Sequence, residues 1–171
     1  MRFLLIVILF SCSKKLEEVK NYQIPNYFQK VSNGKIIEYE FDKKNWEILA
    51  DSIIELNGYY IVLKFSLKFY DNNNQISGVL IGDSGIMEKN SRNMKAYGNV
   101  IFKSKDSSFL KTNKLYWNDI IRRIYTDDSV YIYDSKNKRE LWGIGFESDA
   151  EFKHIRILRN VRGKGEGNLT K

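Results

Sequence analysis

Residues Ile61-Val62-Leu63-Lys64-Phe65-Ser66-Leu67-Lys68-Phe69 give the clearest secondary-structure signal in the chain. Successive side chains of a β-strand point to opposite faces, whereas the 3.6-residue period of a helix would scatter this alternation. The pattern predicts a strand whose apolar face consists of Ile61, Leu63, Phe65, Leu67 and Phe69, opposite Lys64, Ser66 and Lys68. A period of two recurs along the chain, so we expect an all-β domain.

A repeated tripeptide sets the spacing of these strands. Gly98-Asn99-Val100, Asp128-Ser129-Val130 and Arg159-Asn160-Val161 recur at intervals of about 30 residues, each preceded at the same distance by Gly82, Thr112 or Gly143. Such a period is typical of stacked units, and the alternation makes each unit a β-hairpin. Clusters of Asn, Asp and Ser predict turns at 71–75, 88–91, 105–108 and 135–138.

The N-terminus has the pattern of a lipoprotein signal. Arg2 precedes an unbroken apolar stretch, Phe3 to Phe10, which is too short for a bilayer span of roughly 20 residues and is typical of a signal-peptide core. Leu9-Phe10-Ser11-Cys12 resembles the lipobox of bacterial lipoproteins, in which the cysteine is acylated. Because Cys12 is the only cysteine, we expect it to be lipidated and no disulfide to form within the chain.

These signals divide the chain into four parts. We expect a signal peptide at 1–11, a lipidated cysteine and flexible tether at 12–35, one β-domain at 36–163 and a disordered tail at 164–171. The domain is long enough to bury a core. We see no second domain boundary.

Four stretches of the domain carry a family resemblance. They are Trp46-Glu47-Ile48-Leu49-Ala50-Asp51, Met94-Lys95-Ala96-Tyr97-Gly98-Asn99-Val100, Leu110-Lys111-Thr112-Asn113-Lys114-Leu115 and Leu141-Trp142-Gly143-Ile144-Gly145-Phe146-Glu147-Ser148-Asp149. In their order and spacing they resemble the LptC family, the membrane-anchored periplasmic component of the lipopolysaccharide-export machine. The resemblance covers roughly residues 36 to 163.

The resemblance implies a fold and a function. The fold would be a single twisted, boat-shaped β-jellyroll of the LptA type, open along one side. Its apolar interior would accept the lipid A acyl chains of lipopolysaccharide from the inner-membrane ABC transporter and pass them to a periplasmic bridge protein of the LptA type. A lipid on Cys12 would replace the family's transmembrane helix, so we expect a periplasmic protein anchored to the cell membrane, the inner rather than the outer one.

Alternation along the strands nominates the lining of the groove. We expect it to consist of Ile48, Ile61, Leu63, Phe65, Leu67, Phe69, Leu80, Met94, Val100, Phe102, Leu115, Trp117, Ile124, Val130, Ile132, Phe146 and Ile155, with Ala50, Ala96 and Gly143 providing space. Each of these could equally be plain core. A glycine inside a strand weakens it unless a close approach needs the missing side chain, so we hypothesise that Gly143 keeps the groove open.

The two edge strands of an open jellyroll are natural docking sites because their amides are unpaired. By resemblance, the edge near Ile36 and Ile37 would meet the transporter. The opposite edge, with Phe152, Ile155, Ile157 and Val161, would meet the next bridge subunit.

The net charge of +7, or +6 without Arg2, is compatible with an anionic partner. Basic residues such as Lys105, Arg122 and Lys136 would attract phosphate or merely solvate the outer face. Nucleic acid is not an expected partner of a secreted lipoprotein.

An enzyme is the least supported class. Gly82-Asp83-Ser84-Gly85 copies the tetrapeptide around the nucleophile of trypsin-like proteases, but the only histidine, His154, follows that serine instead of preceding it. One histidine and one cysteine also provide no transition-metal cluster, so we expect no catalysis, metal or cofactor. The main alternative to a lipid carrier is a jellyroll lipoprotein that only binds proteins, as a scaffold or assembly factor.

Overall fold

The computed structural model describes residues 29–149, 152 and 154–165. Within them the chain forms nine strands. Their bounds are β1 Gln29–Glu40, β2 Lys43–Leu56, β3 Tyr59–Tyr70, β4 Ile76–Glu88, β5 Met94–Ser104, β6 Phe109–Asn118, β7 Arg123–Asp134, β8 Arg139–Asp149 and β9 Arg156–Gly165. The four turns predicted from sequence separate β3 from β4, β4 from β5, β5 from β6 and β7 from β8, so these predictions are confirmed.

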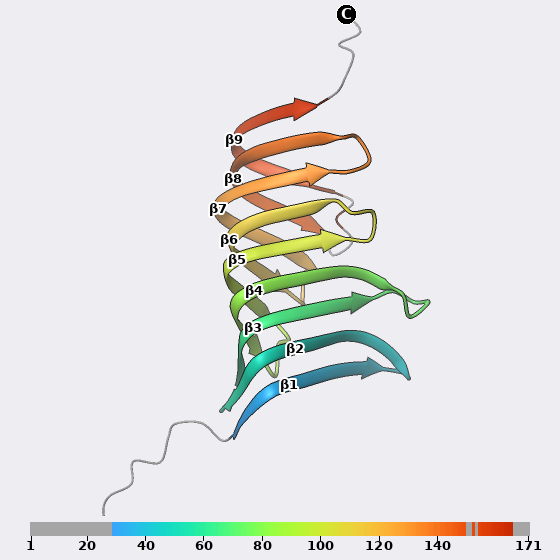
Figure 1. The fold of residues 1–171 in the computed structure, drawn as a ribbon, viewed down its shortest axis with the longest axis vertical. Coiled ribbons are helices and arrows are strands. Elements are labelled where there is room, and N and C mark those ends of the chain that lie inside the picture. Colours follow the sequence, from blue (N-terminus) through green and yellow to red (C-terminus); the bar gives the residue numbers. More distant parts are fainter. Residues whose placement is uncertain (1–28, 150–151, 153, 166–171) are drawn as a thin grey trace, which may run out of the picture.

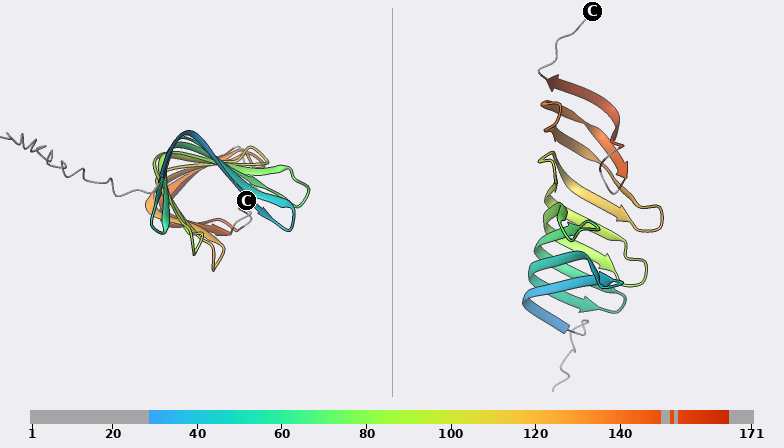
Figure 2. Two further views of the ribbon diagram at one scale, coloured as in Figure 1. Left: turned by 90° about the horizontal axis from the view of Figure 1, so that it is seen from below. Right: turned by 90° about the vertical axis from the view of Figure 1, so that its right-hand side faces the viewer.

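The strands form one antiparallel sheet in sequence order, in which each strand pairs only with its neighbours along the chain. They stack along the long axis of the molecule (Figure 1). Seen down that axis, every strand curves back, and the sheet forms a trough rather than a flat layer (Figure 2). This architecture confirms the predicted all-β, open jellyroll.

A bend in the middle of the strands produces the trough. β1, β3, β5 and β9 each contain a residue in the left-handed region, Asn33 (φ 49°), Lys64 (φ 46°), Asn99 (φ 45°) and Asn160 (φ 52°). The backbone pairing skips or shifts at these positions. Three of the four are asparagine, which tolerates this conformation better than most residues. The repeated tripeptides around Asn99 and Asn160 therefore mark bends.

The bends divide the sheet into two walls. The first wall comprises 34–50, 65–81, 100–111, 129–142 and 162–165, and the second comprises 29–32, 52–63, 84–97, 116–126, 146–149 and 155–159. The apolar face of each wall looks into the trough, where the buried side chains form one cluster. The least exposed of them are Phe146, Leu67, Leu110 and Val100.

The bend at Lys64 changes which residues of β3 point inward. Val62 is buried, with 3% of its surface exposed, whereas Leu63 is 38% exposed. Because Lys64 adopts a positive φ and falls out of the pairing, the alternation shifts by one residue there. The placement of Ile61 and Leu63 on the inner face was therefore wrong. Phe65, Leu67 and Phe69, on the other side of the bend, point inward as expected.

The sheet extends further than the expected domain of 36–163. β1 begins at Gln29 and β9 ends at Gly165. The first residues of β1 are exposed and mostly polar, so alternation gave no signal there. The predicted signal peptide, Cys12 and the beginning of the tether lie outside the described residues.

Candidate functional site

The space between the two walls is a groove of about 1370 Å³. Most of the predicted lining residues surround it: Ile48, Phe65, Leu67, Phe69, Leu80, Met94, Ala96, Phe102, Leu115, Trp117, Ile124, Ile132, Phe146 and Ile155. Contact of these side chains with a lipid stays a prediction. We call this space the central groove.

Six predicted lining residues lie elsewhere. Ile61 and Leu63 belong to the outer face. Val100, Val130 and Gly143 are buried close to the bends, and none of them lines the central groove. Ala50 is buried and lines a separate hollow of about 560 Å³ at the bends of the first five strands.

The prediction missed other apolar lining residues, which include Trp46, Val62, Gly78, Gly85, Ile86, Met87, Phe109, Leu110 and Phe152. Alternation counted backward from a recognised bend would have found Val62, and alternation from the predicted turns would have found Met87 and Leu110. Phe152 lies in no strand, so periodicity could not have placed it.

Phe152 was expected at a docking edge, and the structure places its ring inside the central groove. The ring lies flat on Phe102, with centroids 3.9 Å apart and an interplanar angle of 2°, and its centroid is 5.8 Å from that of Phe146. Phe152 connects β8 to β9 in a left-handed conformation (φ 55°). An aromatic stack therefore occupies part of the space that sequence reasoning left open.

Gly143 does not line the central groove, and the structure gives it another role. A Cβ atom at this position would overlap the side chain of Ile157 and lie 2.9 Å from the carbonyl oxygen of Arg159. Both neighbours belong to β9. The missing side chain thus allows β9 to pack closely on β8.

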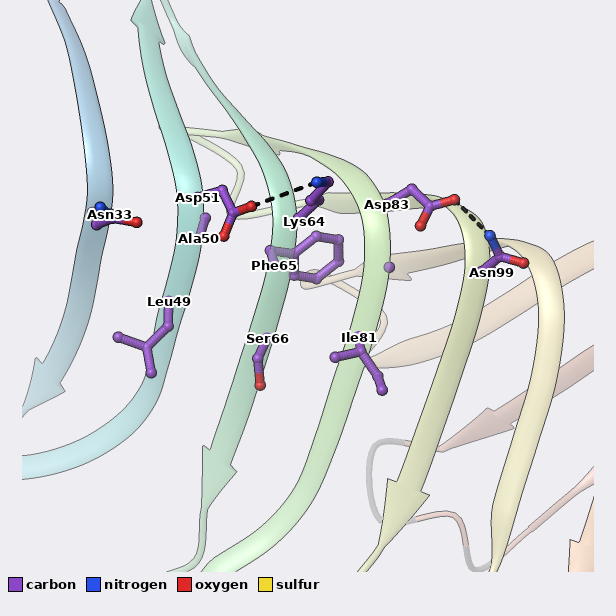
Figure 3. Close-up of a pocket in the computed structure, with 12 residues that line it drawn as sticks. Asn33, Leu49, Ala50, Asp51, Lys64, Phe65, Ser66, Ile81, Asp83 and Asn99 are labelled. Atoms are coloured by element: carbon purple, nitrogen blue, oxygen red, sulfur yellow. Dashed lines mark hydrogen bonds and ion pairs between the residues drawn. The ribbon is translucent and has the colours of Figure 1, made fainter.

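Polar side chains replace the backbone pairing at the bends. Lys64 Nζ lies 3.8 Å from Asp51 Oδ2, and Asn99 donates a hydrogen bond of 2.8 Å to Asp83 (Figure 3). A similar polar contact occurs between β6 and β7, where Lys114 lies 3.7 Å from Asp128. These contacts join neighbouring strands where the ladder is interrupted.

The mouth of the central groove has charged rims. Arg92, in the turn after β4, lies 3.3 Å from Glu38 on the opposite wall and 3.1 Å from Asp119 in the turn after β6. The hydrogen bond to Glu38 raises the pKa of Arg92 above its ordinary value. Lys105 and Asp71 form a further rim pair at 3.2 Å. Hydrogen bonds from the backbone N–H groups of Gln75 and Asn73 hold the pKa of Asp71 below its usual value.

An apolar interior with charged rims suits an amphiphilic molecule. Apolar chains gain free energy when they leave water, and charged or polar parts are best left at the rim. The geometry can therefore shelter alkyl chains between the walls while a polar portion stays at the mouth.

Among the strands that the structure describes, β1 and β9 are the edges of the sheet, and each pairs on one side only. Ile36 and Ile37 of β1 are half-buried. At the other end Ile157 packs against the core, whereas Ile155 and Val161 are 42% and 57% exposed. Val161 occupies the repeat position of buried Val100 and Val130, and it is exposed because no further strand of the described chain covers it.

The two residues considered as catalytic candidates, Ser84 and His154, lie apart in the fold. Ser84 lies within β4, opposite Leu63 and Tyr97. His154 is exposed, and its Nδ1 atom lies 2.5 Å from Asp149. Among the described residues no three His, Cys, Asp or Glu side chains gather as metal ligands would. The part of the chain that the structure describes contains no helix with the length and hydropathy of a membrane span.

Fold and groove together define an open β-jellyroll with an apolar interior. A crystal structure with this fold is that of LptH from Pseudomonas aeruginosa, the LptA-homologous periplasmic component of the lipopolysaccharide transport device. The two chains are 12% identical, with a TM-score of 0.58 over 71% of this chain and 95% of LptH.

The family is shown by sequence. The model of the family described as lipopolysaccharide-assembly, LptC-related, matches residues 11–166, and the chain belongs to this family. No protein of curated function matches the sequence significantly.

Proposed function

We propose that this protein is a lipid carrier of the lipopolysaccharide-export bridge. It accepts lipopolysaccharide from the inner-membrane ABC transporter and passes it along the central groove to a periplasmic bridge protein of the LptA type. The observation that carries this proposal is the groove itself, which lies between two apolar walls and is bounded by free edges at β1 and β9. Family membership supports the same role.

The anchor is part of the proposal. Lipidation of Cys12 tethers the domain to the periplasmic face of the inner membrane, and the segment up to Gln29 gives it reach. Mass spectrometry of the N-terminal peptide tests this directly: a multiply acylated cysteine supports the anchor, and an intact signal peptide contradicts it.

Photocrosslinking in cells tests the transfer function. β3 offers a matched pair of leucines, because Leu67 is 1% exposed and lines the groove, whereas Leu63 is 38% exposed on the outer face. We expect a photoreactive residue to give lipopolysaccharide adducts at position 67 and none at position 63. Equal adducts at both positions, or none at position 67 in a folded protein, would contradict the carrier.

One observation favours the alternative of a scaffold without lipid transfer. The stacked rings of Phe102 and Phe152 fill part of the central groove. A scaffold would keep this stack in place at all times, whereas a carrier must let acyl chains pass it. Absence of adducts at position 67, together with normal complex formation, would establish the scaffold.

A further inference from the structure

β9 combines a free edge with an unusual charge. It contains Arg156, Arg159, Arg162 and Lys164 and no acidic residue. Its backbone pairs with β8 on one side and with no described strand on the other. An unpaired edge is a template for strand addition, so its side chains select what can be added.

The four cations are all exposed. Their cross-strand partners on β8 are Glu147, Ile144, Trp142 and Glu140, in that order. Directly opposed residues lie on the same face, and Trp142, which is 38% exposed, stacks on the outer face against Tyr131. Arg162 and Lys164, opposite Trp142 and Glu140, therefore lie on the outer face, as does Arg156 opposite Glu147, while Arg159 is exposed directly before the bend at Asn160.

The carboxylates of β8 are placed to pair with only two of the four cations. Arg156 lies 2.6 Å from Glu147, and Lys164 is opposite Glu140. Arg159 and Arg162 face Ile144 and Trp142, and neither forms an ion pair with any residue that the structure describes. Two exposed guanidinium groups are therefore left for whatever lies beyond the edge.

The other edge of this chain does not complement them. On β1, Gly34 and Ile36 face the interior, opposite Ala50 and Ile48, so Lys35 lies on the outer face. Lys30 is outward by the same alternation, since its neighbour Val31 pairs with buried Ile53. A second copy would thus present lysines to the arginines of β9, and like charges opposed across strands are destabilising.

We propose that β9 takes up an acidic β-strand from a different protein and rejects the β1 edge of a second copy of this chain. Carboxylates of the added strand pair with Arg162 on the outer face and with Arg159 at the bend, and its inward side chains cover Val161 and extend the groove. This inference rests on the proposed function, because it names the chemistry of the next subunit in the bridge. It assigns the charge row a role in choosing the partner and the direction of assembly.

Two synthetic strand peptides test the proposal on the purified full chain. They share the same apolar residues at alternate positions and carry Glu or Lys at the others. We expect the Glu peptide to bind about tenfold more tightly at low salt, and this preference to shrink as salt screens the charges. Hydrogen exchange should show that bound peptide protects amides of β9.

Charge reversal supplies the matched variants. Arg159→Glu combined with Arg162→Glu should reverse the preference between the peptides and increase self-association in sedimentation. Lys103→Glu combined with Lys111→Glu makes the same charge change on the outer face of β5 and β6, away from either edge, and should alter neither result.

Equal binding of both peptides, protection of β1 instead of β9, or unchanged self-association of the edge variant would overturn the inference. The crosslink at position 67 separates this failure from failure of the proposed function. Lipid adducts without charge-selective binding would support the carrier function and contradict the proposal of an acidic partner strand. Charge-selective binding without lipid adducts would support the acidic partner strand and contradict the carrier function.

Discussion

Replacing Gly143 with alanine tests whether β9 depends on a close approach to β8. The added Cβ would overlap Ile157 and lie 2.9 Å from the carbonyl oxygen of Arg159. The carbonyl is backbone and cannot rotate away, so β9 itself must shift. Overpacking of this kind costs about 1–3 kcal/mol, and the usual gain from replacing a strand glycine is about 0.5–1 kcal/mol. The difference is a net loss of up to about 2.5 kcal/mol, and because the contact is with rigid backbone we expect about 1–2 kcal/mol.

Thermal unfolding followed by circular dichroism measures this loss. For a domain of this size each kcal/mol lowers the Tm by about 2–4 °C, which gives an expected decrease of about 2–8 °C. The rate of amide hydrogen exchange should increase most in β9, since the displaced atoms belong to that strand. Gly163→Ala is the control, because its Cβ would meet the flexible end of Leu141 at 3.0 Å and the carbonyl oxygen of Glu140 only at 3.6 Å, an ordinary contact distance.

The same variant separates the two roles considered for Gly143. If the residue positions β9, alanine weakens docking at that edge while lipid adducts at Leu67 persist. An unchanged Tm together with unchanged exchange in β9 would refute the steric reasoning. Loss of lipid adducts with a fully protected β9 would instead restore the hypothesis that Gly143 keeps the groove open.

Three further predictions concern β3, the aromatic stack and the rim. Val62→Asp should destabilise the fold by about 3 kcal/mol or more in urea unfolding, because the charge would be buried, whereas Leu63→Asp should cost less than about 1 kcal/mol. Phe152→Ala should increase binding of an apolar fluorophore by vacating the groove, while Phe41→Ala, at a side chain that is 93% exposed and does not line the groove, should not. Because the pKa of Asp71 is lowered on folding, its stabilisation is complete above the unfolded value of about 3.9 and is lost as the pH falls through the folded value. Asp71→Asn should therefore lose less stability than the wild type between pH 5 and pH 3, as measured by urea unfolding.

The strands and their repeat could be predicted because each wall is a half-buried surface with strict alternation. Phe65, Leu67 and Phe69 lie on one side of a bend, so alternation predicted the face on which the structure has them. The error at Leu63 arose because a single left-handed residue, Lys64, reverses the phase. Lysine is not a residue that signals this conformation, so propensity alone could not have identified the bend.

The asparagines of the repeat are a sequence signal for the bends. Asn99 and Asn160 recur with the repeat and tolerate positive φ, and both proved to be bends. The position of Phe152 could not be predicted, because its contacts with Phe102 and Phe146 join segments that no local pattern relates. The role of Gly143 likewise depended on the distance between two strands, which a sequence does not specify.

The order of the strands makes the length of this molecule easy to change. Since each described strand pairs only with its neighbours in sequence, no strand pairing among the described residues of 29–165 closes the two ends of the sheet on each other. Duplication of one hairpin would insert two strands and lengthen the groove by about 10 Å, without altering the packing of the remaining units. Evolution can thus match the span of such a protein to the gap it must cross by adding or deleting units of about 30 residues.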